Sequence, residues 1–339
     1  MLQCGLSRNI KKLGYVVMTK LIIQIPCFNE AESLPVTLQQ LPRQLEGVDK
    51  IEWLIIDDGS TDNTIQVARN LGVDHIIPLI AHQGLAKGFM AGIHACIARG
   101  ADIIVNTDAD NQYHAGDIPK LIQPILDGKA EFVVGERPIS EIKHFSPLKK
   151  LFQKWGSWFV RVISNTSIPD APSGFRAFSR EAAMRMHVFS NYTYTVETII
   201  QAGLRGMAVT SVPIRTNGFL RKSRLISNVP AYLYRSFSTI IRIFMTYRPL
   251  GFFVVPGSLS FLIGTLLGLR FLYFYFITGT SNGHIQSLIL TAVLLILGSL
   301  LIIVGLLADL ISANRKLIED VEYRLYKTQE QINNLNNKS

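Results

Sequence analysis

The sequence predicts an α/β fold in which a mostly parallel sheet has helices on both faces and is followed by a two-helix transmembrane hairpin. Between residues 20 and 140, short apolar runs alternate with amphipathic segments, which is the pattern of βα units. Polar loops follow three of these runs. Two long apolar runs, residues 251–277 and 285–310, come late in the chain, and each is long enough to cross roughly 30 Å of hydrocarbon.

The elements of the predicted sheet follow from these runs in order. The expected strands are Ile-, Leu- and Val-rich segments bounded by Pro, Gly, Asp or Asn. Apolar residues at three- and four-residue spacing indicate the helices between these strands. Asn29 and Thr61 are the expected N-caps of the first two helices. Strands are expected at residues 21–25, 53–56, 75–79, 102–105 and 132–134, and helices at residues 30–41, 62–71, 85–99 and 117–126.

Three polar loops are expected to meet in one crevice. Parallel α/β sheets bind ligands at the carboxyl ends of their strands, and the loops at residues 26–30, 57–62 and 108–112 all follow strands. In the last loop, Asp108 and Asp110 stand two residues apart, so in an extended chain they point the same way. An Asp-x-Asp pair alone is more often a solvated turn. Beside the two other loops, it predicts a site for Mg²⁺ or Mn²⁺.

Composition and charge point to a membrane surface. Apolar residues make up 48% of the chain, and the formal net charge is +9. The basic residues cluster beside apolar segments, at residues 143–161, 215–242 and 315–316. This arrangement favours anionic lipid and phosphorylated ligands over nucleic acid. The three cysteines are far apart without metal-ligand spacing, which indicates reduced structural thiols.

The predicted organisation has five parts. A leader at residues 1–19 is expected to be disordered, with Met18 as an alternative start of translation. The link between the apolar runs lacks Lys and Arg, whereas the outer flanks are basic, so the positive-inside rule places both termini in the cytoplasm. The remaining parts are a cytoplasmic domain at residues 20–228, an interfacial amphipathic helix at 229–248, the hairpin at 250–311 and a cytoplasmic helical tail at 312–339.

The tail repeats apolar residues at seven-residue spacing. Ile311, Ile318, Leu325 and Ile332 form this series, which fits a short coiled-coil seam. A lone amphipathic helix fits nearly as well, because Asn314 and Thr328 interrupt the seam. The first interpretation allows a homo-oligomer through the hairpin and the tail.

The motifs of the polar loops together resemble a known family, the family-2 glycosyltransferases with a GT-A fold. Within it, the similarity is greatest to dolichol-phosphate mannose synthases and bacterial polyprenyl-phosphate glycosyltransferases, and it covers about residues 20–250. The resemblance implies a GT-A domain at residues 20–228 and a reaction that inverts the anomeric centre. The motifs are Ile25-Pro26-Cys27-Phe28-Asn29-Glu30, Asp57-Asp58-Gly59-Ser60-Thr61-Asp62, Asp108-Ala109-Asp110-Asn111-Gln112 and Ser173-Gly174-Phe175-Arg176, together with Glu197 and Val212-Pro213-Ile214.

The resemblance also implies roles on the donor side. The residues that would line the nucleotide-sugar pocket are Pro26, Asn29, Glu30, Asp58 and Asp108, with Lys87 of the glycine-rich segment Gly84–Gly88 reaching toward the diphosphate. The metal ligands would be Asp108, Asp110 and Gln112. A divalent cation there would stabilise the departing nucleoside diphosphate.

On the acceptor side, the resemblance implies that Arg137 of Gly135-Glu136-Arg137 grips a lipid phosphate, since guanidinium suits bidentate phosphate contacts. Further acceptor-phosphate candidates are Lys154, Ser157, Arg221 and Arg224. Asp170 would act as a base or orient the acceptor. The expected catalytic residues are therefore Asp110, Asp170 and Arg137.

The resulting hypothesis is a membrane-bound, metal-dependent transfer of a sugar from a nucleotide-diphosphate donor to undecaprenyl or dolichyl phosphate. A first alternative keeps the fold and makes the acceptor a hydroxyl of a glycolipid or polysaccharide, which has a stronger need for a base. A second alternative is a non-catalytic membrane scaffold. The sugar, the base, the lipid length and the choice between Mg²⁺ and Mn²⁺ stay open.

Overall fold

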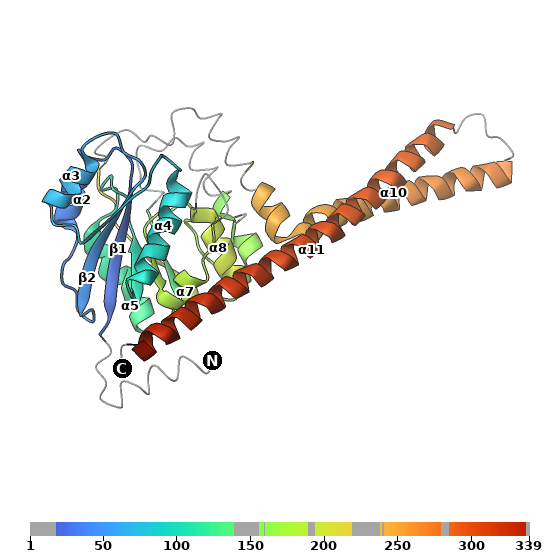
Figure 1. The fold of residues 1–339 in the computed structure, drawn as a ribbon. Helices are drawn as coiled ribbons and strands as arrows, with labels where there is room; N and C mark the ends of the chain where they lie inside the picture. The colour runs from blue at the N-terminus through green and yellow to red at the C-terminus, as the bar shows by residue number, and fades with distance from the viewer. Residues whose placement is uncertain are drawn as a thin grey trace. The chain divides into compact units, whose positions relative to one another are not determined.

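The computed structural model describes residues 18–138, 156–158, 160–188, 194–218, 238, 241–278 and 285–336. Most of the predicted leader and most of the predicted interfacial helix lie outside these residues. The chain divides into two compact units, residues 1–224 and 225–339, and each is described by itself (Figure 1).

The described part of the first unit contains a seven-stranded sheet in the order β3-β2-β1-β4-β6-β5-β7. All neighbouring strands pair in parallel except β6, which runs antiparallel to both β4 and β5. The mostly parallel sheet predicted from the sequence is confirmed. The strands are β1 (Lys20–Cys27), β2 (Lys50–Asp57), β3 (His75–Pro78), β4 (Ile103–Asn106), β5 (Phe132–Glu136), β6 (Arg176–Ser179) and β7 (Val209–Pro213).

Helices cover both faces of this sheet (Figure 1). Helices α2 and α5 lie against one face, and α4 and α7 lie against the other. The helices of this unit are α2 (Leu34–Gln40), α3 (Thr64–Asn70), α4 (Leu85–Ala98), the 3₁₀ turn η1 (Ala115–Asp117), α5 (Ile118–Leu126), α7 (Arg180–Met184) and α8 (Thr195–Leu204).

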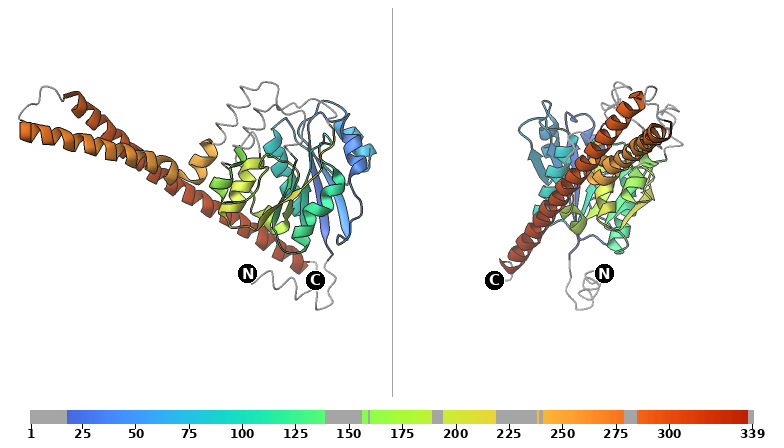
Figure 2. Two further views of the ribbon diagram at one scale, coloured as in Figure 1. Left: turned by 180° about the vertical axis from the view of Figure 1, so that it is seen from behind. Right: turned by 90° about the vertical axis from the view of Figure 1, so that its right-hand side faces the viewer.

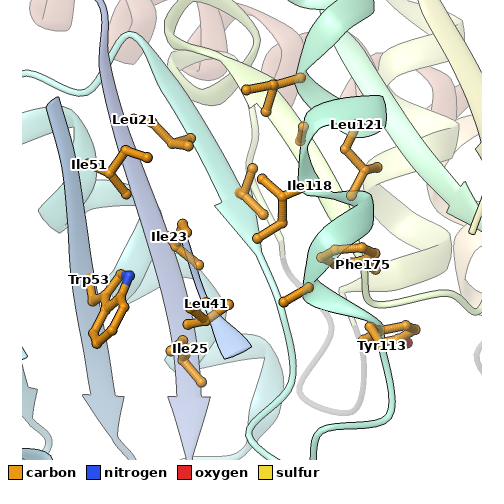
Figure 3. Packing of buried hydrophobic residues seen from close by; sticks show 14 of the residues in the cluster. Leu21, Ile23, Ile25, Leu41, Ile51, Trp53, Tyr113, Ile118, Leu121 and Phe175 are labelled. Carbon is orange, nitrogen blue, oxygen red and sulfur yellow. The ribbon is translucent and has the colours of Figure 1, made fainter. Parts of the chain in front are cut away.

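The core on the α2 and α5 face is built by alternation along the strands (Figure 3). Leu21, Ile23 and Ile25 of β1 point into it, and all three are fully buried. They pack in one cluster with Ile118 and Leu121 of α5. Burying a side chain of this size contributes about 1.5–3 kcal/mol, so this face holds the strand ends in fixed positions.

Several element boundaries differ from the prediction, and two of them lie beside the first loop. Strand β1 was expected to end before Pro26 but continues to Cys27. The carbonyl oxygen of Gln24 points toward β4, and that of Cys27 points toward β2. Because backbone groups alternate sides along a strand, Pro26 faces β4, just beyond the last β1–β4 pair. Its missing N–H therefore interrupts no pairing. The first helix begins at Leu34, after a turn, because Asn29 has a φ of 54° and does not cap it.

A charge cluster lies near the amino end of β2. The carboxylate of Glu52 accepts from Lys20 Nζ at 2.8 Å, Lys50 Nζ at 2.7 Å and His75 Nε2 at 2.8 Å. Burial alone would raise the pKa of Glu52, but these hydrogen bonds outweigh it and lower the pKa to about 2. The ionised carboxylate is thus more stable in the folded chain than in the unfolded chain.

Replacing Glu52 by Gln is expected to lower the free energy of unfolding at pH 7 by about 1–2 kcal/mol. A depressed pKa stabilises the fold above the unfolded value of 4.5, and this contribution disappears as the pH falls toward 2. The difference between the two proteins should therefore shrink from pH 7 to pH 3. Thermal unfolding followed by the fluorescence of the neighbouring Trp53 measures it, and a difference that grows in acid would contradict the assignment.

The second unit contains two long helices, α10 (Pro249–Thr278) and α11 (Ile285–Asn336). By length and composition, both qualify as membrane spans. They lie side by side (Figures 1 and 2), in contact through glycines. A Cβ on Gly298 would lie 2.8 Å from the carbonyl oxygen of Gly257, and one on Gly305 would lie 2.8 Å from Val254 Cγ2. Small residues of this kind let membrane helices approach closely.

Candidate active site

The paired-aspartate loop follows β4 and is held from two sides. Thr37 of α2 donates a hydrogen bond from Oγ1 to the carbonyl oxygen of Ala109 at 2.8 Å. Asn217, beyond β7, donates from Nδ2 to the carbonyl oxygen of Asn111 at 3.0 Å. Asn111 has a φ of 56°, a conformation that Asn tolerates better than most residues. Two distant elements therefore fix the backbone between Asp108 and Gln112.

Asp108 lies in a tight, partly buried setting. Tyr113 donates a hydrogen bond to its carboxylate, and the N–H of Gly174 donates to Tyr113 Oη at 2.8 Å. A Cβ on Gly174 would lie 3.0 Å from Asp108 Oδ2, so a glycine leaves room beside the carboxylate. Burial, followed by the negative charge of Asp110, raises the pKa of Asp108 to about 7. Two carboxylates crowded in this way favour a bound cation.

A neutral polar network lies beneath Asp108. Gln24 of β1 donates from Nε2 to Asn106 Oδ1 at 2.8 Å. Asn106 donates from Nδ2 to the carbonyl oxygen of Gly174 at 2.9 Å and to Tyr194 Oη at 2.8 Å. Because these amides are fully buried and hydrogen-bonded to one another, they form a rigid floor.

Asp58, at the end of β2, binds the backbone of a second loop. Its Oδ1 accepts from the N–H of Gln83 at 2.7 Å, and its Oδ2 accepts from the N–H of Gly84 at 2.8 Å. A Cβ on Gly59 would lie 2.7 Å from His82 N, and its φ of 73° also requires a glycine. The two loops are therefore in direct backbone contact.

His82 lies beside Asp58 and contacts it. Its Nδ1 lies 2.9 Å from Asp58 Oδ2. Its ring stacks on Phe28, with 4.0 Å between ring centroids, and more than half of its side chain is exposed. The sequence offered no paired pattern that would have singled out this histidine, because Phe28, Asp58 and His82 come from three different loops.

The other predicted donor-side residues lie near the same strand ends. Asn29 accepts at Oδ1 from the N–H of Thr61 at 2.8 Å, and Glu30 is buried with Oε2 2.5 Å from Ser33 Oγ. Asn29 therefore holds the first loop to the loop after β2, whereas the cited bond of Glu30 lies within its own segment. Lys87 is exposed in the first turn of α4.

Arg137 and Asp170 form an ion pair at the end of β5. Arg137 donates from Nε to Asp170 Oδ2 at 2.7 Å and from Nη2 to Asp170 Oδ1 at 2.9 Å. The backbone N–H of Arg137 adds a third bond, at 3.2 Å. Asp170 is fully buried, while 10% of the Arg137 side chain is exposed. The charge of Arg137 also acts on Asp108, which links this pair to the aspartate loop.

The loop that carries Asp170 is held by Arg176, the first residue of β6. Arg176 is fully buried and donates to the carbonyl oxygens of Ser173 and Ala171, both at 2.7 Å. Ser157, a predicted acceptor-phosphate residue, is buried beneath the same loop, and its Oγ accepts from the N–H of Ala171 at 3.3 Å. Lys154, Arg221 and Arg224 lie outside the described residues.

Residues that the sequence analysis missed surround the predicted ones. Tyr113 and Tyr194 contact the aspartate loop and its floor, and neither belongs to a motif that would have identified it. Within the described part of the chain, there is no group of three His, Cys, Asp or Glu residues suited to a metal. A cation at Asp108 and Asp110 would therefore need other oxygen donors, from Gln112 or from a ligand.

Comparisons with known proteins identify relatives of this chain. The family model "Glycosyl transferase family 2" matches residues 22–186. A UDP-N-acetylglucosamine–dolichyl-phosphate N-acetylglucosaminyltransferase of Methanococcus voltae is 31% identical over 217 residues, covering 57% of this chain and 83% of that protein. An undecaprenyl-phosphate mannosyltransferase of Micrococcus luteus is 26% identical over 200 residues, covering 56% of this chain and 80% of its own.

Among solved structures, glucosyl-3-phosphoglycerate synthase from Mycobacterium tuberculosis, in complex with Mn²⁺, UDP and glucosyl-3-phosphoglycerate, superposes with a TM-score of 0.53. It is 16% identical and covers 68% of this chain and 80% of that chain, so this likeness concerns the fold. The sheet and the loops at its edge define a glycosyltransferase of the GT-A fold.

The chain belongs to glycosyltransferase family 2. The resemblance found in its motifs is thereby confirmed.

Proposed function

We propose that this enzyme transfers a sugar from a nucleoside-diphosphate donor to a polyprenyl phosphate at a membrane. The observation that most supports this acceptor is the guanidinium of Arg137, held in a fixed orientation by Asp170 beside the aspartate loop. A planar, permanently charged group suits an incoming phosphate. The printed activities of the two relatives, on dolichyl and undecaprenyl phosphate, support the same acceptor class.

The oxygen atoms of the aspartate loop fit a hard divalent cation. Asp108, Asp110 and Gln112 offer only oxygen atoms and amide groups, and Mg²⁺ and Mn²⁺ prefer oxygen. The absence of a Cβ at Gly174 leaves space beside Asp108. When bound, the cation would neutralise charge on the leaving diphosphate.

The side chains of the protein would position the two phosphorylated reactants. An oxygen of the acceptor phosphate forms a bond to the anomeric carbon as the bond from that carbon to the diphosphate breaks, which inverts the centre. A phosphate monoester, with a second pKa near about 6, is largely ionised at neutral pH. Since it has little need of a base, Asp170 serves best by orienting Arg137.

The membrane anchor supports a lipid substrate. Arg248 lies before α10, whereas Arg315 and Lys316 follow the apolar part of α11. The positive-inside rule then puts both termini and the catalytic unit in the cytoplasm, with the link at residues 279–284 outside. Anchoring keeps the enzyme on the surface where a polyprenyl phosphate exposes its headgroup.

The decisive experiment uses the full chain in lipid nanodiscs with a panel of labelled nucleotide sugars, Mg²⁺ or Mn²⁺, and undecaprenyl or dolichyl phosphate. Label in the organic phase that mild acid releases as free sugar supports the proposal. Label that appears only in water-soluble glycans, or in a glycolipid formed without polyprenyl phosphate, would establish the hydroxyl-acceptor alternative instead.

The stacked pair Phe28 and His82, beside Asp58, is proposed to form one wall of the nucleotide pocket. Replacing His82 by Ala is expected to raise the KM for the donor about threefold to tenfold with little change in kcat, because an aromatic contact contributes about 0.5–1.5 kcal/mol. Initial rates against donor concentration measure this effect.

The matched control is His94→Ala, since His94 is exposed ten residues into α4. An unchanged donor KM in His82→Ala, or an equal rise in His94→Ala, would remove His82 from the pocket.

A further inference from the structure

The tail of α11 exposes a continuous seam of heptad positions. We define the tail seam as seven residues of the heptad repeat. The first positions are Ile311, Ile318, Leu325 and Ile332, and the fourth positions are Asn314, Val321 and Thr328. All seven are exposed. Ile311, Ile318 and Leu325 are 70%, 68% and 65% exposed, a large apolar area for one helix to leave in water.

Two residues at the start of the tail, both outside the seam, contact other parts of the second unit. Ser312 is buried and donates from Oγ to the carbonyl oxygen of Thr246 at 3.2 Å, and the guanidinium of Arg315 lies 4.1 Å from the ring centroid of Tyr247. Both contacts are within the second unit. Within the second unit, these two polar side chains make the contacts at the start of the tail, and the seam is left uncovered.

The spacing of the seam points to a helical partner. A straight α-helix drifts by about 20° in each heptad, so a strict seven-residue repeat follows a partner helix in a left-handed supercoil. A flat bilayer surface would instead select a stripe with the helix's own period. Four first-position residues keep the seven-residue step from Ile311 to Ile332 without a stutter.

The charges of the tail also disfavour a lipid surface. Helices that lie on membranes carry an excess of Lys and Arg on their polar face. Between residues 312 and 336, four bases and four acids cancel, and Arg324 pairs with Asp320 at 2.8 Å. These residues are Arg315, Lys316, Arg324 and Lys327 against Glu319, Asp320, Glu322 and Glu330.

We infer that the tail seam binds the tail seam of a second copy of this chain in a parallel, two-stranded coiled coil. Helix α11 continues from the apolar span into the tail without a break, so copies inserted in the same membrane have tails that point the same way and start at the same height. β-branched Ile occupies three of the four first positions, where two-stranded coiled coils favour it. Asn314 and Thr328 are polar seam residues and lower the stability of the pairing.

Membrane anchoring compensates for the short seam. Three heptads form a marginal coiled coil in dilute solution, but confinement to one bilayer raises the effective concentration of one tail near another. The inference concerns assembly and does not depend on the acceptor or on the chemistry of the proposed function.

Cross-linking of single cysteines in native membranes tests this pairing. The parent is the full chain with Cys4→Ser, in which the buried Cys27 and Cys96 are retained. With a short bismaleimide, Ile318→Cys and Leu325→Cys should yield at least about fivefold more dimer than the exposed controls Lys316→Cys and Asp320→Cys, which point away from the partner in this register. Equal dimer from all four sites would overturn the inference.

Two further measurements keep the result unambiguous. A double variant, Ile318→Asp with Leu325→Asp, should convert the dimer to a monomer in native mass spectrometry of nanodiscs while glycosyl transfer shows that the catalytic unit is folded. Seam cysteines that resist a water-soluble maleimide yet form no cross-link would indicate docking on lipid or on the same chain, and would overturn the inference.

Discussion

Replacing Asp110 by Ala is expected to lower the rate of glycosyl transfer by about a thousandfold, which corresponds to about 4 kcal/mol of lost stabilisation. The change removes one of two carboxylates that converge after β4, and it leaves the other without a partner for a divalent cation. The loop itself should persist, because Thr37 and Asn217 hold it through backbone carbonyl groups. Radiolabel transfer under saturating donor measures the effect.

The control for this change is Asp127→Ala, which removes an aspartate after α5 that pairs only with neighbouring residues in the described structure. It should leave the transfer rate within a factor of about two, as expected for a surface ion pair. Transfer by Asp110→Ala within tenfold of the unmodified enzyme would exclude the proposed metal site.

Replacing Arg137 by Ala is expected to reduce kcat/KM for the lipid phosphate about a hundredfold, since charge-assisted hydrogen bonds contribute about 1.5–3 kcal/mol each. Asp170→Asn should cause a loss of similar size, because its amide can no longer accept both bonds from Arg137. Binding of the nucleotide to either variant should be unchanged, which titration calorimetry with the nucleoside diphosphate can verify.

The double variant separates the two possible roles of Asp170. If Asp170 acts by orienting Arg137, Arg137→Ala with Asp170→Asn should be no slower than Arg137→Ala alone, because the two residues work as one unit. If Asp170 removes a proton from a hydroxyl acceptor, the losses should multiply, and the loss in Asp170→Asn should diminish as the pH rises. Multiplied losses would favour the hydroxyl acceptor over the lipid phosphate.

Most of the proposed donor-binding part of the site could be predicted from the sequence. Strands β1, β2 and β4 are apolar runs with clear ends, and polar residues follow each of them. Local pattern and strand ends were sufficient there because consecutive βα units place those ends on one edge. Both predicted N-caps were wrong, because Ser33 and Asn63 precede the two helices. The side chain of Asn29 instead bonds the backbone of Thr61 in a different loop.

The proposed acceptor-binding part of the site depends on contacts that sequence spacing does not reveal. Strand β6 has four residues and pairs antiparallel between β4 and β5, and no local signal indicated its direction. Asp170 and Arg137 are 33 residues apart, so their bidentate contact arises only when β5 and β6 pair. The roles of both residues in catalysis stay predictions.

The reversal of β6 decides which residues share the edge of the sheet with the aspartate loop. In this register, Asn106 and Val134 both pair with Arg176. The pairing of β6 therefore holds the segment before it, which includes Asp170, at the sheet. The reversal brings the residues that precede β6, Asp170 among them, to the edge of the sheet at which β4 and β5 end. A parallel β6 would have placed these residues at the opposite edge, away from Asp108.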